Sequence, residues 1–361
     1  MKVLDIGLPI AALAAALLLF GGFVWLSGAS PIETWTILFK GAFGDWFSWQ
    51  NTLQRAAPLM LTALCVALPA RAGLIIIGGE GAVVLGGLAA AALPYALPLP
   101  GNVVGSTMVC LAGMVVGAAW IAIAGALRQY RGVNETISSL LLAYTGVALF
   151  KQLVEGPLRD PTTLNKPSTR SLVEALQIGG IAGSDVHWGL VLGVVACLGL
   201  GLWLALTASG FSVRVVGGNL RAAQLVGLPA NRLILVTCAI GGAAAGLAGA
   251  VEVAAVHTNA NASLIAGYGY AGILVAFIAR QNPFAIIPVA ILFGGFGAAG
   301  SLLQRRLGLP DASVQVLQGI AFVLILASES LRSVDWSAVV KKLRQRATPE
   351  PAPLAVEQST A

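Results

Sequence analysis

The stretch that decides the fold is residues 54–97, QRAAPLMLTALCVALPARAGLIIIGGEGAVVLGGLAAAALPYAL. Its two apolar runs, 54–70 and 74–97, are separated by only three residues, Arg71 to Gly73. An apolar run of about 20 residues is long enough for a helix to cross a bilayer. We therefore expect two membrane helices joined by a very short turn, with a break in the second helix at the glycines that flank Glu80.

The composition of the whole chain extends this interpretation. Of its 361 residues, 57% are hydrophobic and 10% are charged, whereas soluble domains carry about 25% charged residues. This excludes a soluble enzyme, a nucleic-acid-binding protein and a disulfide scaffold. The sequence predicts an all-α, polytopic membrane protein with about ten transmembrane helices, some short or broken. The expected spans are 6–26, 54–70, 74–97, 103–127, 134–154, 188–207, 232–256, 266–280, 283–303 and 312–331.

The basic residues predict the orientation of these spans. With both termini in the cytoplasm, 13 of the 21 Lys and Arg residues fall on the inner side and eight, including Arg55, on the outer side, which agrees with the excess of positive charge on cytoplasmic loops. The first apolar run, 6–26, exceeds the apolar core of a secretory signal, and we expect it to be an uncleaved span. The transmembrane domain is expected to cover 1–332, followed by a disordered cytoplasmic tail, 333–361.

Three further stretches are expected to lie outside the bilayer core. Segment 28–53 contains Trp35, Trp46 and Trp49 and predicts an interfacial helix, because Trp favours the headgroup layer. Segment 155–187 is expected to be a polar outer loop. Segment 208–231 is the longest inner loop before the tail.

The sequence contains no motif for catalysis, metal binding or phosphate binding. The four cysteines stand singly in apolar runs, and neither of the two histidines has a Cys or carboxylate at metal-ligand spacing. No lysine is followed by Ser or Thr, so the phosphate-binding G-x-x-x-x-G-K-[ST] motif is excluded. We expect no catalytic residue, no metal and no cofactor in this chain, and any ATP must be bound by another polypeptide.

Carboxylates within the apolar segments are candidate functional groups, because charge inside a membrane is costly. Glu80 either contacts the solute or bonds the free amides of a broken helix. Glu135 follows Asn134, and this pair fits a helix start as well as a pathway. For Glu252 an interfacial or packing role competes with a role in the pathway.

Polar groups gather near the outer end of the seventh and eighth spans, where they form either a solute site or an interfacial aromatic belt. These groups are His257, Asn259, Asn261, Tyr268 and Tyr270. The candidate pathway residues are Glu80, Asn134, Glu252, His257, Asn259, Tyr268 and Tyr270.

Two glycine patterns have competing interpretations. Gly242, Gly246 and Ala250 recur at four-residue spacing, which favours close helix packing. The glycine-rich starts 78–81 and 267–270 are either the mark of two related halves of a transporter or a coincidence in a chain with 44 glycines.

Four ordered segments resemble a known family. GGNLRAA at 217–223, continued by Gly227-Leu228-Pro229, is similar to the cytoplasmic coupling segment of permeases from ABC importers for branched-chain amino acids, ribose and nucleosides. RAGLIIIGGEG at 71–81 resembles the family's RAGLFNIGAEGQ, GVNETISSLLL at 132–142 its GVNEVISTIMLNY, and GPLRDP at 156–161 its outer-loop GPLRDP. The chain departs from the family at Ile75–Ile77 and at the alanine after Gly81.

The resemblance is to the longer of two paired permeases in nucleoside-type importers, and it implies the following expectations. The chain forms the pathway for a small neutral polar solute, a nucleoside or nucleobase, in a bacterial inner membrane. Its partners are an ATPase subunit, a second and shorter permease, an extracytoplasmic solute-binding protein and membrane lipid, without nucleic acid. The expected contacts with the ATPase are Asn219, Arg221, Ala222, Ala223 and Gly227.

Three other functions remain open from the sequence. The chain is alternatively an ABC permease for a sugar or another small polar solute. A self-sufficient secondary transporter would need a buried carboxylate or histidine relay, for which the sequence offers only Glu80. A membrane scaffold would transport nothing.

Overall fold

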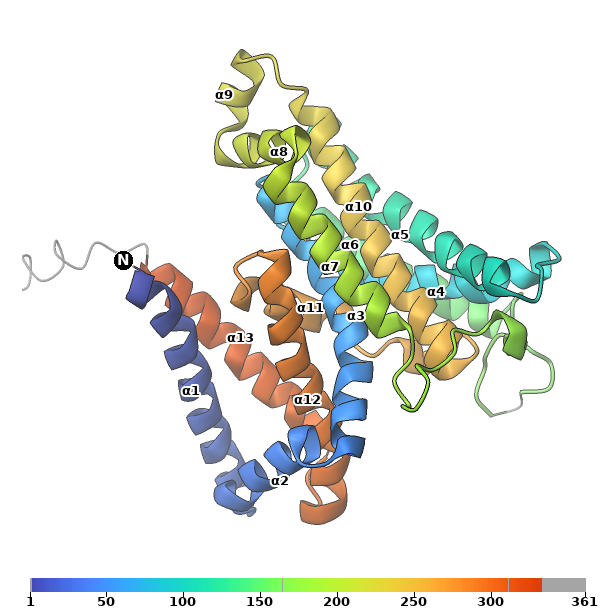
Figure 1. Cartoon of the computed structure of the whole chain (residues 1–361), viewed down its shortest axis with the longest axis vertical. Helices are drawn as coiled ribbons and strands as arrows, with labels where there is room; N and C mark the ends of the chain where they lie inside the picture. Colours follow the sequence, from blue (N-terminus) through green and yellow to red (C-terminus); the bar gives the residue numbers. More distant parts are fainter. Residues whose placement is uncertain (1, 164, 311, 333–361) are drawn as a thin grey trace, which may run out of the picture.

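The computed structural model describes residues 2–163, 165–310 and 312–332 (Figure 1). In this part of the chain all regular structure is helical, apart from two isolated bridges between single residues. The long helices are α1 Lys2–Leu26, α2 Pro31–Phe43, α3 Trp46–Arg71, α4 Gly79–Ala96, α5 Val103–Arg131, α6 Glu135–Glu155, α7 Gly189–Leu206, α8 Ala208–Gly218, α10 Ala230–Val251, α11 Tyr268–Ile278, α12 Pro283–Leu307 and α13 Ala312–Arg332. The short elements are η1 Glu174–Leu176, α9 Leu220–Leu225, the π-helix η2 Glu252–His257 and η3 Ala262–Leu264.

The all-α membrane fold is confirmed, but the expected number of spans is too high. Seven helices in the described residues are long and apolar enough to cross a membrane, and α1 with α2 adds an eighth if this pair, bent by 120°, is one span. Two shorter apolar helical segments, Ala262–Ile278 and Ala312–Ser328, fall below the length required for a crossing. Sequence hydropathy alone does not separate a full crossing from a half-helix, which explains the difference.

The prediction for segment 28–53 is wrong in its second half. An interfacial helix was expected there, but α2 ends at Phe43 and α3 begins at Trp46, so that α3 has 26 residues and is not short. Polar residues at the start of α3 suggested a position outside the bilayer, yet Gln50 and Thr52 are buried. The Thr52 hydroxyl donates to the Ala42 carbonyl at 2.6 Å, which satisfies this polar group inside the bundle.

The centre of the molecule is helix α10, which packs against α3, α4 and α5 (Figure 1). Glycines permit this approach. A Cβ atom on Gly86 of α4 would lie 2.5 Å from the Gly246 Cα of α10, and one on Gly113 of α5 would lie 2.8 Å from the Gly246 carbonyl oxygen. The packing interpretation of the small-residue pattern at Gly242 and Gly246 therefore holds, and these backbones meet as small-residue interfaces do in lipid.

The two ends of the bundle differ. Helices α8 and α9 project at one end, beyond the ends of α3 and α7 (Figure 1). At the other end, segment 165–187 is bonded to the chain after α10. Leu172 N donates to the Thr258 carbonyl at 2.7 Å, and Ile178 N donates to the Ala254 carbonyl at 2.9 Å. The segment predicted to be an outer loop thus covers the end of α10, and after that prediction we call residues 165–187 the outer cap.

The glycine contacts lead to a stability prediction. Replacing Gly246 by Leu should force α10 away from α5, at a cost of about 1–3 kcal/mol or more, and lower the thermal midpoint of the purified protein in detergent. The matched control is Gly199→Leu on α7, where a Cβ atom meets nothing within 4 Å. Equal midpoints for the two variants would contradict the packing account.

Candidate solute cavity

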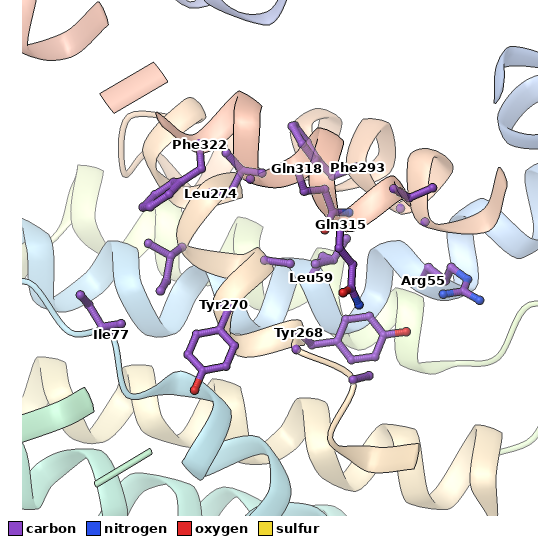
Figure 2. Close-up of a pocket in the computed structure, with 18 of the residues that line it drawn as sticks. Arg55, Leu59, Ile77, Tyr268, Tyr270, Leu274, Phe293, Gln315, Gln318 and Phe322 are labelled. Atoms are coloured by element: carbon purple, nitrogen blue, oxygen red, sulfur yellow. The ribbon is translucent and has the colours of Figure 1, made fainter. Parts of the chain in front are cut away.

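A cavity of about 530 Å³ lies between α3, α11, α12 and α13 (Figure 2). Its volume is in the range of small-molecule sites. The residues that line it are Arg55, Leu59, Ile77, Leu140, Ala266, Gly267, Tyr268, Tyr270, Ala271, Ile273, Leu274, Phe293, Gly294, Gly297, Val314, Gln315, Gln318, Gly319 and Phe322.

Most polar side chains of the cavity lie toward one end, whereas Tyr270 lies on the side of Ile77 (Figure 2). Figure 2 shows Arg55 and Tyr268 at the same end, with Gln315 reaching from α13 toward Tyr268. Ile77 and Phe322 lie at the opposite end of the view. A few convergent polar groups on a largely apolar wall are typical of a site that orients a small organic molecule.

The wall formed by α11 depends on Glu80. One Glu80 carboxylate oxygen accepts a hydrogen bond from Gly267 N at 2.9 Å, and the other accepts from Gly269 N at 2.7 Å. These amides belong to the unpaired first turn of α11, and a carboxylate is favourable at the positive end of a helix. Because Glu80 lies in the first turn of α4, it joins the N-termini of two helices.

The glycines of the two similar helix starts make this contact possible. A Cβ atom on Gly79 would lie 3.5 Å from the Gly269 Cα, and one on Gly269 would lie 2.5 Å from the Glu80 Cα. Gly267 has a φ of 78°, which is left-handed and favours glycine. The two glycine-rich segments are therefore parts of one junction.

The extended segment before α4 is also fixed by hydrogen bonds. Ile77 N donates to the Ser139 hydroxyl at 3.0 Å, and the Thr136 hydroxyl donates to the Ile75 carbonyl at 3.1 Å. Of the isoleucines that replace the family's Phe-Asn-Ile, Ile76 is fully buried and Ile77 lines the cavity.

The seven predicted pathway residues do not form one site but lie in different parts of the structure. Tyr268 and Tyr270 line the cavity, whereas Glu80 lies behind its wall and is 1% exposed. For Glu80 the geometry agrees with the alternative that its carboxylate bonds the free amides of a broken helix. Asn134 is the N-cap of α6, accepting from Thr136 N at 2.9 Å.

The other three lie near the end of α10. Glu252 is buried, and its carboxylate lies 3.5 Å from His257 Nε2. Asn259 donates to the Ser171 hydroxyl at 3.5 Å, and Asn261 donates to the Asn259 amide oxygen at 2.6 Å. The expected polar cluster thus connects η2 with the outer cap, and only its two tyrosines reach the cavity.

The sequence interpretation missed three polar residues of the cavity. Arg55 was assigned to the outer side because the second span was expected to start at residue 54, but α3 begins at Trp46 and carries Arg55 inside the span. Gln315 and Gln318 stand three residues apart on α13. Residues with this spacing share a helix face, so two amides on one face of an apolar segment were a usable signal.

The predicted contact residues for an ATPase lie at the α8–α9 end. The Asn219 side chain accepts from Ala222 N at 3.0 Å and caps α9, and Gly227 has a φ of 80° in the turn that follows. Ala223 is fully buried, so it supports α9 from within. The most exposed large apolar residues there are Leu225 and Val226, at 88% and 72%.

Among the described residues, no group of three or more His, Cys, Asp or Glu side chains is placed to hold a metal ion. The four cysteines are free thiols, and three of them are buried. These side chains pack as small apolar groups.

The comparisons with known proteins identify the family. Residues 48–326 match the family described as "Branched-chain amino acid transport system / permease component". The chain belongs to this permease family. It is therefore a multi-pass ABC transporter permease and not an enzyme, as its sequence indicated.

Three known permeases are similar to this chain over most of its length. The "Glucose ABC transporter permease protein TsgB13" of Haloferax volcanii is 31% identical, over 90% of this chain and 87% of that one. The "Guanosine ABC transporter permease protein NupP" of Bacillus subtilis is 24% identical, over 90% of this chain and 94% of that one. The "Nucleoside ABC transporter permease protein NupB" of Lactococcus lactis subsp. cremoris is 26% identical, over 94% and 97%.

His187, in the outer cap just before α7, leads to a pH prediction. It is 4% exposed, neither ring nitrogen has a hydrogen-bond partner among the described residues, and burial lowers the pKa of its imidazole below the ordinary 6.5. Below pH 6.5 the unfolded chain therefore binds a proton that the folded chain excludes, and stability falls as the pH decreases.

We expect the free energy of unfolding to fall by about 1 kcal/mol more in the wild type than in His187→Leu between pH 7.5 and 5.5. Thermal unfolding in detergent at both pH values measures the difference. Identical pH dependence in the two proteins would contradict the assignment of a neutral, buried His187.

Proposed function

We propose that this chain forms the translocation pathway of an ATP-driven importer and that its solute is a nucleoside or nucleobase. The observation that carries the proposal is the cavity, with Arg55, Tyr268 and Gln315 at one end and an apolar wall that includes Phe322. A planar base packs on aromatic and aliphatic side chains, while its polar edge takes hydrogen bonds. The guanosine and nucleoside permeases among the relatives support this solute class.

The second candidate solute is a sugar, which the glucose permease relative favours. Sugars present hydroxyl groups around most of the ring and require many hydrogen-bond partners. This cavity offers a few polar side chains grouped at one end, and a molecule with one polar edge and two apolar faces fits that distribution better.

The proposed energy source is a separate ATPase that docks on the end formed by α8 and α9. Leu225 and Val226 provide an exposed apolar contact on a small helical projection. The same end carries Arg71 at the end of α3 and Arg128 and Arg131 at the end of α5, which favours a cytoplasmic position. This orientation places both termini of an inner-membrane protein in the cytoplasm, with any tail beyond residue 332 on that side.

Two further partners complete the proposed importer. Relatives occur in pairs, NupP with NupQ in Bacillus subtilis and NupB with NupC in Lactococcus lactis, which supports a second, homologous permease. A solute-binding protein would deliver the solute to the cap formed by 155–187. The proposed transmembrane domain covers 1–332.

Uptake of labelled nucleosides tests the solute assignment. We expect cells that lack this chain to lose most ATP-dependent uptake of at least one nucleoside, and a plasmid copy to restore it. Glucose uptake in the same cells is the control. Unchanged uptake of every nucleoside together with loss of glucose uptake would overturn the nucleoside assignment and favour the sugar alternative.

The docking surface leads to a second prediction. Leu225→Asp places a charge on the exposed apolar contact and should reduce ATPase co-purification and uptake at least tenfold, while the amount of permease in the membrane stays unchanged. The control for co-purification is Val173→Asp, an exposed apolar residue at the opposite end of the bundle, which is 62% exposed against 88% for Leu225. Normal co-purification with Leu225→Asp would show that the ATPase docks elsewhere.

A further inference from the structure

Arg55 is the one charged side chain among the described residues that line the cavity. It lies within the span formed by α3 and is exposed, and no described residue forms an ion pair or hydrogen bond with it. A charged side chain in a membrane-spanning helix normally faces a water-filled cavity and is functional.

The room for this side chain comes from α12. A Cβ atom on Gly297 would lie 3.6 Å from the Arg55 Cδ and 3.8 Å from Nη1. The side chain therefore lies against α12 at a glycine, where a Cβ atom would be in van der Waals contact with it. This arrangement leaves the guanidinium free to reorient toward a solute.

The Glu252 carboxylate, which is buried beside His257, interacts electrostatically with Arg55. The N–H groups of the guanidinium have no hydrogen-bond partner among the described residues. The N–H donors of Arg55 are therefore available to acceptors on a solute.

The polar side chains of the cavity differ in the hydrogen bonds that they can form. Gln315 and the Tyr268 hydroxyl can each donate or accept, whereas a guanidinium has five N–H donors and no acceptor. A planar guanidinium pairs with two acceptors on one edge of a ring, such as the O6 and N7 atoms of a 6-oxopurine. If an amino group replaces the oxo group, its N–H donors face the N–H donors of the guanidinium. Neither group then has an acceptor there, and the hydrogen bond is lost.

We infer that Arg55 makes the cavity select nucleosides with an oxo group over nucleosides with an amino group at the same ring position. This inference rests on the proposed function, because it takes a nucleoside as the solute. It specifies which edge of the base is recognised and identifies Arg55 as the side chain that recognises it.

Two matched pairs of solutes test the inference, since inosine and adenosine differ at ring position 6 and uridine and cytidine at ring position 4. The measurement is the ratio of initial uptake rates within each pair, in cells that express the complete importer. Arg55→Gln and Arg55→Met should each lower the inosine-to-adenosine ratio about tenfold, and the uridine-to-cytidine ratio less, because O4 of uridine is a single acceptor without a second one beside it. Arg55→Lys keeps a donor-only group and should retain most of the preference.

The control is Arg306→Gln, an exposed arginine at the end of α12 that does not line the cavity, and its ratios should equal those of the wild type. Because the binding protein is the same in all strains, a change in the ratio of uptake rates measures a change in the selectivity of the permease. Unchanged ratios in Arg55→Gln or Arg55→Met, or an equal loss of all four solutes in every Arg55 variant with the complex still assembled, would overturn the inference alone. A wild-type importer that takes up none of the four nucleosides would overturn the proposed function and the inference with it.

Discussion

The structure depends on one buried carboxylate placed between the starts of two helices. The Glu80 side chain accepts hydrogen bonds from Gly267 N and Gly269 N and lies itself in the first turn of α4. In the apolar interior of a membrane, unpaired amides cost several kcal/mol each, and irregular backbone is tolerated only where protein or a cavity satisfies it. Without this carboxylate, α11 could not begin in the middle of the bundle, and the short α11 would not form a wall of the cavity.

The rest of the bundle holds this junction in place. Glycines let α4 and α5 contact α10 backbone to backbone, which fixes α4 on the side of Glu80. Ser139 of α6 bonds Ile77 N, and the Arg71 guanidinium donates to the Gln281 carbonyl at 2.9 Å after the end of α11. The chain that enters α4 is therefore tied to α6, and the chain that leaves α11 is tied to the end of α3. A displacement of α3 or α8 near Arg71, where a Cβ atom on Gly73 would lie 3.4 Å from the Gly217 backbone, would reach the cavity through these contacts.

The sequence predicted much of this fold, and its failures have physical reasons. The apolar segments and the glycine break at Glu80 were predictable, because a membrane imposes length and polarity on each helix. The family was predictable from four ordered sequence motifs. The length of α3 was not, since Gln50 and Thr52 look like the end of a span until their buried partners are known. The candidate site was only partly predicted. Tyr268 and Tyr270 were named, but Arg55 was placed outside the bilayer, and the way in which Glu252, His257 and Asn259 turn toward the outer cap depends on the π-helix after α10.

The central claim, that Glu80 holds the start of α11, is tested most directly by hydrogen exchange at the amides of Gly267 and Gly269. The purified protein and its Glu80→Gln variant should be compared by mass spectrometry of peptides that cover 265–272, with peptides from the end of α12 as the reference. The account predicts strong protection in the wild type and at least tenfold faster exchange of these amides in the variant, since an amide side chain offers one acceptor where a carboxylate offers two. Equal and strong protection in both proteins would contradict it.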